Sequence, residues 1–320
     1  MNLQEFYRSA VSIGIDYDPR GAAWVKKTLQ RAKDEYSKLT TEEKIWAGKE
    51  YMVNPYADTR VLNGQPDLSI SARILVGIDI GIGEILVADK LNERGKNIDL
   101  VVAHHPEGKA YAKFHTITQM QADILHKFGI PINIADGIMN EKLRAAENKI
   151  AQVNVNRETD VAVLLDIAYI CIHTPANNAA TTFLQRIMDK EKPERISDIM
   201  NILKVIPEYK EALKRHSGPK ILAGNSETRT GKIFVDMIGS AEGAPQLYEQ
   251  LARAGIGAII CTSMSPESVR EAEKQHIAVV AAGSTASDSL GLNLVLDKIL
   301  KDTNIEVIEC SGFRRFIHEQ

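Results

Sequence analysis

The first seventy residues have apolar positions at the spacing that is typical of helices. Between residues 24 and 36 the apolar side chains recur along one helical face, which predicts an amphipathic helix. Thr40 and Glu43 have the spacing of a capping box ahead of a second helix. Residues 54–67, NPYADTRVLNGQPD, are rich in turn-forming side chains and end this part of the chain. The pattern predicts a helical extension over residues 1–70.

A different pattern begins at residue 71. Short apolar runs rich in β-branched residues alternate with amphipathic segments: the runs are ILVGID, IDLVVAHH and IPINIA, separated by EILVADKLNERG and TITQMQADILHKFG. Strands that alternate with helices of about 10–15 residues are typical of crossover units in a largely parallel sheet. The segment DVAVLLDIAYICIHTPAN continues the pattern. We therefore expect a first α/β half over residues 71–190.

The alternation is interrupted and then starts again. Residues 191–217 are polar and helical, with breaks at Pro193 and Pro207, and are expected to form a connector. Apolar runs then return at intervals, and these are KILAG, GKIFVDMIG, GAIICT, IAVVAAG and IEVIEC. They predict a second α/β half over residues 218–320. The fold class is thus α/β, with two mainly parallel-sheet halves flanked by helices and an N-terminal helical extension.

Composition excludes several classes of protein. The 320 residues are 44% hydrophobic and carry a net charge of −3 without a long basic run, so a nucleic-acid partner is not expected. No apolar run reaches the roughly 18 residues of a membrane span, and the first residues lack the apolar run of a signal peptide. The three cysteines are too scattered for a disulfide framework. These features predict a cytoplasmic protein without a membrane partner.

Polar side chains follow four of the predicted strands. They are Asp79, the pair His104-His105, His173, and the segment from Ser284 to Asp288. In an open parallel sheet, ligands bind beyond the carboxyl ends of the strands, so these groups are expected to share one pocket. Side chains alternate faces along a regular strand. Two adjacent histidines can therefore reach one site only where the strand ends and the backbone turns.

The same residues have simpler interpretations. His104 and His105 could be a hydrogen-bonded pair without a metal, because imidazole serves both purposes. Asp288 could be a helix N-cap or a first-turn acid. Asn177 could cap a helix that begins at residue 178 or 179. The residues alone leave these alternatives open.

Three motifs resemble the signatures of the NGG-interacting-factor-three superfamily, which includes the YbgI-type proteins. GIDIGIGEILVADKL followed by IDLVVAHHPEG resembles the first signature, IHTPANN the second, and IAVVAAGSTASDSLG the third. Their order agrees with that family, and the resemblance covers about residues 71–315. The helical extension and the connector resemble the larger branch of the family. The resemblance implies a dinuclear metal centre and a closed ring of subunits, often a hexamer.

The resemblance also implies which residues hold the metals. Carried over motif by motif, the ligand positions are His104, His105, Asn177, Ser284 and Asp288. Asn177 stands where the family has a bridging aspartate, and Ser284 stands where it has a histidine. A neutral amide and a hydroxyl are weaker ligands for a transition metal, so metal affinity is expected to be below that of the family. His173, His115 and Glu107 are close enough in sequence to compensate.

Two functions are compatible with these residues. The first is a metal-dependent hydrolase that uses zinc, iron, manganese or nickel, one ion or two, to act on a small-molecule substrate. His173 or Glu107 would then move protons, and the family resemblance attaches a GTP cyclohydrolase label. The second is a non-catalytic scaffold that binds a small ligand or a partner at an eroded site, with a weakly bound metal or none. The replacements at Asn177 and Ser284 motivate the second hypothesis.

Overall fold

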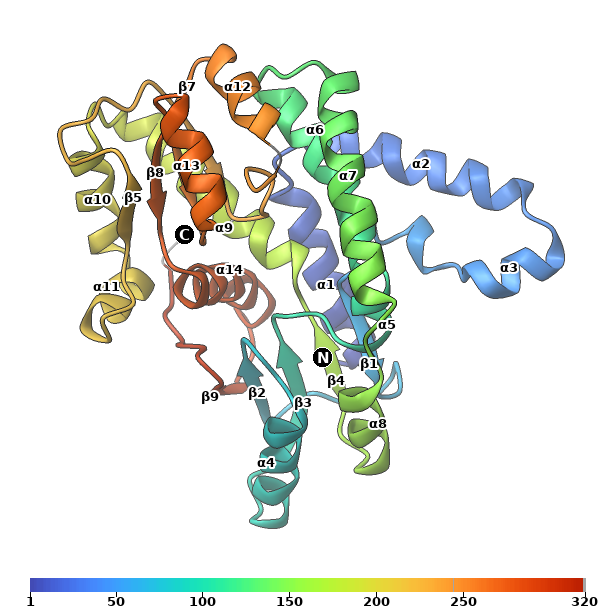
Figure 1. Cartoon of the computed structure of the whole chain (residues 1–320). Helices are drawn as coiled ribbons and strands as arrows, with labels where there is room; N and C mark the ends of the chain where they lie inside the picture. Colours follow the sequence, from blue (N-terminus) through green and yellow to red (C-terminus); the bar gives the residue numbers. More distant parts are fainter. Residues whose placement is uncertain (244, 319–320) are drawn as a thin grey trace.

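Strands from both ends of the chain form the first sheet of the protein (Figure 1). The structure is a computed structural model that describes residues 1–243 and 245–318, without the side chains of residues 115 and 116. Its strand order is β1 (Arg60–Asn63), β4 (Tyr169–Cys171), β3 (Ile98–Ala103), β2 (Arg73–Gly77) and β9 (Glu306–Cys310). Edge strand β1 runs antiparallel to β4, and the other pairs are parallel. The predicted mainly parallel sheet is confirmed.

The second sheet repeats this arrangement. Its order is β5 (Lys220–Ala223), β8 (Ala278–Ala281), β7 (Ile256–Cys261) and β6 (Lys232–Asp236). Strand β5 is antiparallel to β8, as β1 is to β4. The first four strands of the chain and the next four are therefore connected in the same order. The expectation of two α/β halves is confirmed at the level of fold class.

Helices surround both sheets and form the layer between them. Around the first sheet lie α4 (Ile82–Glu93), α5 (Gly108–Ala112), η2 (Phe114–Ile117) and α8 (Arg157–Leu164). Helices α6 (Thr118–Phe128), α7 (Ile132–Ile150), α12 (Pro245–Arg253) and α13 (Pro266–Lys274) accompany the second, and α10 (Ile196–Val205) and α11 (Pro207–Lys214) precede it. No helix among the described residues combines the length and the apolar character that a membrane crossing requires.

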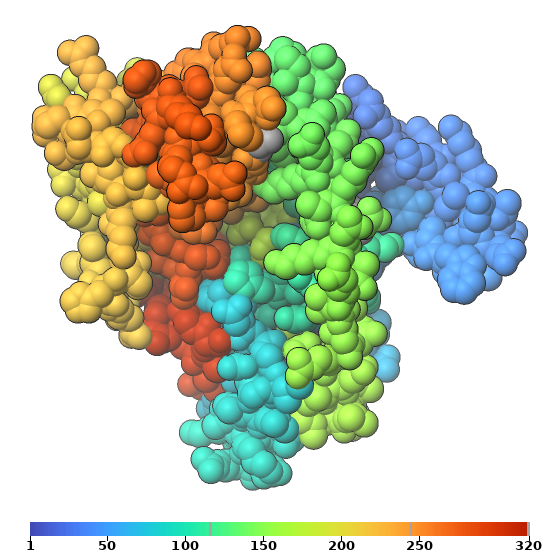
Figure 2. Space-filling view, viewed as in Figure 1, coloured from blue at the N-terminus to red at the C-terminus, as the bar shows by residue number. Residues whose placement is uncertain are grey.

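The core between the two sheets is built on α1 (Leu3–Asp16), α9 (Thr174–Glu191) and α14 (Ser284–Ile299). Leu3 and Phe6 of α1 are fully buried there, together with Val76 of β2 and Val280 of β8. By contrast, α2 (Ala22–Lys38) and α3 (Thr41–Ala47) project from the body (Figures 1 and 2), and the chain returns to it at η1 (Glu50–Met52), where Glu50 pairs with Arg60. Burial of apolar side chains from both halves on shared helices makes the halves interdependent.

Two local predictions are wrong. The run IPINIA was expected to be a strand, but α7 begins within it: the amides of Ile134 and Ala135 donate to the carbonyl of Pro131. A run of alternating apolar residues this short does not distinguish a strand from a buried helix start. The run IEVIEC, expected in the second half, forms β9 of the first sheet, where Glu306 pairs with Arg73 at 2.6 Å.

A glycine contact sets how closely α9 and α14 approach. A Cβ at Gly291 would lie 2.3 Å from the carbonyl oxygen of Ala176. We expect Gly291→Ala to lower the free energy of unfolding by about 2–3 kcal/mol, because overpacking a backbone contact forces the helices apart. Denaturant unfolding measures this. Gly137→Ala in α7 is the control, because nothing lies within 4 Å of its added Cβ, and it should stabilise by about 0.5–1 kcal/mol. Equal effects of the two substitutions would contradict the prediction.

Candidate metal centre

The carboxyl end of β3 carries both histidines of the predicted pair. The backbone amides of His104 and His105 each donate 3.0 Å hydrogen bonds, to the carbonyls of Gly77 and Ile78. This continues the pairing of β3 with β2 past the end of the regular strand. Because the chain turns there, both imidazoles face one site, and their ring centroids are 5.1 Å apart. His173 follows β4 and is the N-cap residue of α9, and its ring lies 4.8 Å from that of His104.

His104 is the buried member of the group, with 1% of its surface exposed. Its Nδ1 lies 3.2 Å from the carbonyl oxygen of Ile172. A carbonyl only accepts, so Nδ1 carries the proton and Nε2 of a neutral ring carries a lone pair. That Nε2 is 3.3 Å from Asp288 Oδ1, without a hydrogen bond to any described residue. Burial lowers the pKa of His104 despite the opposing carboxylate of Asp288, which favours the neutral ring.

The other two histidines are anchored in the same way. Nδ1 of His105 lies 2.6 Å from Asp79 Oδ1, and Nδ1 of His173 lies 2.7 Å from Asp58 Oδ2. A carboxylate also only accepts, so each Nδ1 carries a proton, and Nε2 is the ring atom that can offer a lone pair to a metal. One ring nitrogen of each of the three histidines lies within 4.8 Å of the others. Anchoring of one ring nitrogen by an outer acceptor is typical of histidines that bind metals.

Asp288 supplies the negative charge of the site. It is 5% exposed, and its Oδ2 lies 3.8 Å from His105 Nε2. Burial opposes ionisation of Asp288, but the interactions with His104, His105 and His173 outweigh it and lower its pKa. Helix α14 begins at Ser284 with Gly283 as its N-cap, so the interpretation of Asp288 as an N-cap is wrong. The structure places this far-downstream carboxylate beside the histidine pair.

The two replaced ligand positions also line the site. Ser284 Oγ donates to Asp288 Oδ2 at 3.3 Å, and Asn177 Nδ2 lies 3.4 Å from His173 Nε2. Asn177 sits in the first turn of α9, which begins at Thr174, so it does not cap a helix starting at residue 178 or 179. Both side chains contact residues of the cluster, and their role as metal ligands stays a prediction.

A cleft of about 810 Å³ opens beside His105 and His173, and Glu107 lies in its wall. Burial, together with the carboxylates of Glu158 and Asp79, raises the pKa of Glu107 to about 7. Phe114 also lines this cleft and packs edge-on against His173. Glu107 therefore stands near the histidines as predicted, and its catalytic role stays a prediction. The side chain of His115 lies outside the described residues.

Asp58 was missed in the sequence analysis. It is fully buried and accepts from His173 Nδ1 and, at 2.6 Å, from Thr174 Oγ1. Burial opposes its ionisation, but these hydrogen bonds lower its pKa. Asp58 precedes β1, whose antiparallel pairing with β4 matches Arg60 with Cys171 and so brings Asp58 to the carboxyl end of β4. Only this antiparallel pairing reveals that Asp58 belongs to the site, because the turn-rich sequence around Asp58 contains no motif.

The fold is shared with solved structures. Against a NIF3 superfamily protein from Sphaerobacter thermophilus, the TM-score is 0.68 at 24% identity, covering 80% of this chain and 92% of that one. The chain has the NIF3 fold. The resemblance to the NGG-interacting-factor-three superfamily is thus confirmed at the level of fold.

Two further solved structures match this chain with lower TM-scores than the S. thermophilus protein does. Reduced HcgD from Methanocaldococcus jannaschii matches at a TM-score of 0.49 and 14% identity, covering 83% of this chain and 94% of that one. A Bacillus cereus protein related to NIF3 matches at 0.40 and 10%, covering 82% and 92%. No family model and no curated protein matches the sequence.

Loss of the hydrogen bonds that Asp58 accepts should measurably lower the stability of the protein. We expect Asp58→Ala to lower the free energy of unfolding by about 2–4 kcal/mol, because the buried Thr174 hydroxyl and the partly buried His173 ring lose their acceptor. Asp79→Ala is the matched control: its side chain is 76% exposed, so its effect should stay within about 0.5 kcal/mol. Denaturant unfolding in the presence of a chelator separates this effect from metal binding. A loss at Asp58 as small as that at Asp79 would contradict the prediction.

Proposed function

We propose that this protein binds one divalent transition-metal ion through His104, His105, His173 and Asp288 and acts as a metal-dependent hydrolase. One observation carries the proposal: three imidazoles have Nδ1 anchored by outer acceptors, and their remaining nitrogens converge with a buried carboxylate. Of these atoms, His104 Nε2 has no hydrogen-bond partner among the described residues, and converging imidazole nitrogens and a carboxylate are groups that a cation binds. The NIF3 fold is compatible with this role.

The residues present fit a metal ion. His104 Nε2 and Asp288 Oδ1 are 3.3 Å apart, and with a neutral ring both atoms are acceptors. Such a contact needs a proton or a cation between the two atoms. Burial lowers the pKa of His104 and so disfavours the proton. Among the side chains that would contact the ion, Asp288 is the one carboxylate, and Asn177 and Ser284 add no charge. A single charged ligand supports one divalent ion in place of the dinuclear centre that the family resemblance implies.

The side chains around the site have separate tasks in the proposed reaction. A bound metal ion would polarise a substrate oxygen and lower the pKa of a water molecule. Imidazole-rich sites favour zinc, iron or nickel over manganese. Glu107, in the wall of the adjacent cleft, accepts a proton from the attacking water and returns it to the leaving group. Asp58 and Asp79 keep the Nδ1 protons of His173 and His105 in place.

A second function is favoured by the replaced positions. Asn177 and Ser284 remove two of the five ligand groups that the family resemblance implies, which supports a non-catalytic scaffold with a small ligand at the same site. The GTP cyclohydrolase label rests on resemblance alone. The hexamer and the cytoplasmic location stay predictions.

Metal content tests the proposed centre. Purified wild-type protein is expected to hold close to one metal ion per chain by elemental analysis. His104→Ala, His105→Ala and Asp288→Ala should each weaken metal binding by about 100-fold or more, because removing a ligand costs at least as much as removing its outer-shell partner. His126→Ala is the control, because His126 is an exposed residue of α6 away from the site.

Restoring the replaced positions sharpens this test. Asn177→Asp with Ser284→His should raise the metal content towards two ions, because the added carboxylate and imidazole supply a second set of ligands. Metal content that is unaffected by the loss of His104, His105 and Asp288 would overturn the proposed centre.

Turnover tests the hydrolase. Against a panel of phosphoesters and GTP, Glu107→Gln should lower kcat by about 10²–10⁴-fold, because the proton acceptor is lost, while metal content stays that of the wild type. Glu147→Gln, an exposed position on α7, is the control and should have no effect. A metal-loaded wild-type protein without turnover on any substrate of the panel would favour the non-catalytic scaffold.

A further inference from the structure

A second cavity lies on the other side of His173, between α6 and α7 and the loops that follow β6 and β7. Its volume is about 440 Å³, and it shares His173 and Phe114 with the cleft that contains Glu107. Besides His173, the polar residues that line it are Thr118, Gln121, Lys142, Thr174, Asn177, Glu242, Thr262, Ser263 and Ser265. The cavity therefore begins at the proposed metal centre and extends to the second sheet.

Lys142 brings a positive charge to this cavity. Its Nζ donates to the carbonyl of Gly239, and no carboxylate of the described residues forms an ion pair with it. The nearby carboxylates are already held by loop donors: Asp236 accepts from the amide of Ala241 at 2.5 Å, and Glu242 accepts from the amide of Ser265 at 3.2 Å. Burial lowers the pKa of Lys142, and Asp236 and Glu242 oppose this. A partly buried ammonium without an ion pair is stabilised by an anion that enters the cavity.

Gln121 adds an acceptor without a partner. The side chain is 7% exposed, and its Nε2 donates to the carbonyl of Ile238 at 2.8 Å. That bond fixes the amide orientation, so Oε1 is the remaining polar atom, and it has no hydrogen-bond partner among the described residues. A buried acceptor without a donor is costly. A ligand with a hydroxyl or amine group would satisfy it.

We propose that this cavity binds the oxyanion group of the substrate, a phosphate or a carboxylate, through Lys142. Gln121 accepts from a hydroxyl or amine of the same molecule. This inference rests on the proposed function, because the cavity meets the metal centre at His173 and so places the rest of the substrate beside it. The substrate class is a small oxyanion that carries a hydrogen-bond donor. Lys142 is then a specificity-determining residue.

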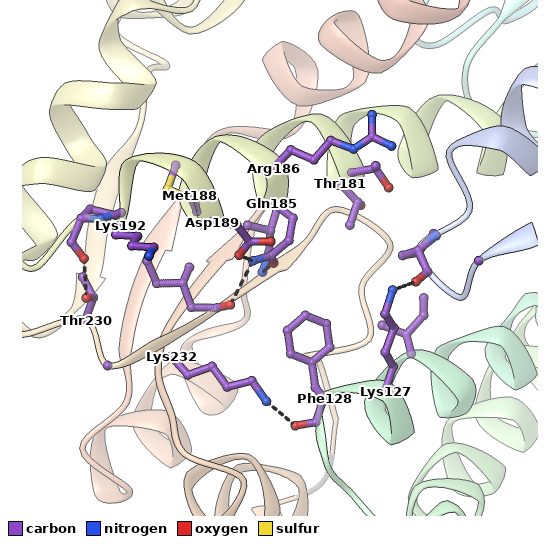
Figure 3. A pocket seen from close by; sticks show the side chains of 18 of the residues that line it. Lys127, Phe128, Thr181, Gln185, Arg186, Met188, Asp189, Lys192, Thr230 and Lys232 are labelled. Carbon is purple, nitrogen blue, oxygen red and sulfur yellow. Dashed lines mark hydrogen bonds between the residues drawn. The ribbon is translucent and has the colours of Figure 1, made fainter.

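A larger cavity among the described residues does not adjoin the proposed metal centre. It measures about 1260 Å³ and lies between α9, β6 and the end of α6 (Figure 3). Two of its three labelled lysines have partners, since Lys127 donates to the carbonyl of Pro19 and Lys232 to that of Phe128. No residue of the proposed metal centre lines it. The 440 Å³ cavity, by contrast, has Lys142 and His173 in the same wall.

Titration calorimetry of the purified full-length protein with inorganic phosphate and with acetate tests the inference. Lys142→Met should raise the Kd of the tighter-binding anion by at least about tenfold, because a charged hydrogen bond is lost. Lys142→Arg should retain binding within about threefold of wild type, because the charge is kept. Lys149→Met, an exposed position on the same helix, should leave Kd unchanged. Tighter binding of phosphate identifies a phosphoester substrate, and tighter binding of acetate identifies a carboxylate.

A metal ion would itself bind phosphate, so the titrations are repeated after chelation. Binding that persists and still depends on Lys142 supports the inference, and it does so even if the wild-type protein contains no metal and the proposed function fails. The inference is overturned if neither anion binds, if Lys142→Met binds as the wild type does, or if Lys149→Met loses as much affinity. If Lys142→Met turns over a substrate with an unchanged KM, the inference about the cavity is overturned, while the proposed hydrolase function stands.

Discussion

Helices α9 and α14 cross where Gly291 lies against the carbonyl of Ala176, at a distance that leaves no room for a Cβ. Asn177 follows Ala176 directly, and Asp288 lies one helical turn before Gly291. The close crossing therefore sets how near Asp288 comes to His104 and His105, which belong to the first sheet. A wider crossing would separate the carboxylate from the imidazoles. The geometry of the candidate metal centre thus depends on the close packing of α9 against α14.

The outer acceptors decide what the imidazoles can bind. Ile172, Asp79 and Asp58 each occupy one Nδ1, so the three rings present nitrogens of the same kind to the site. With a different tautomer, a ring would present an N–H and repel a cation. Only Asp58 among the acidic anchors is buried, and only His104 among the rings is nearly inaccessible. The interior of the site is thus held rigidly at His104 and His173, while His105 and Asp79 face solvent.

Residues that follow strands could be predicted from the sequence, because apolar runs mark the strands and the next polar residue marks their ends. His104, His105, His173 and Asp288 were found this way, and the family motifs named His104, His105 and Asp288 as ligands. Asp58 could not be found, because its position depends on the antiparallel pairing of β1 with β4, between segments about a hundred residues apart. The strand β9 was misplaced for the same reason: local sequence identifies a strand but not the sheet edge that it joins. His173 was assigned to proton transfer, although its ring geometry supports a ligand.

The repeat of strand order also escaped the sequence analysis, and it explains how the two sides of the site differ. Residues 60–78, RVLNGQPDLSISARILVGI, and residues 220–238, KILAGNSETRTGKIFVDMI, occupy equivalent places in the two sheets. They share a glycine with positive φ after the first strand, Gly64 and Gly224. Few other positions agree, so the similarity is visible only once the strands are paired.

The equivalent positions at the strand ends carry different chemistry. His104 and His105 follow β3, whereas Thr262 and Ser263 follow the equivalent strand β7. The first pair presents nitrogen lone pairs to the proposed metal centre, and the second lines the cavity with hydroxyls beside Lys142. Hydroxyls bind a transition metal weakly but donate well to an oxyanion. The same strand-end geometry thus supports metal binding in one half and substrate anchoring in the other.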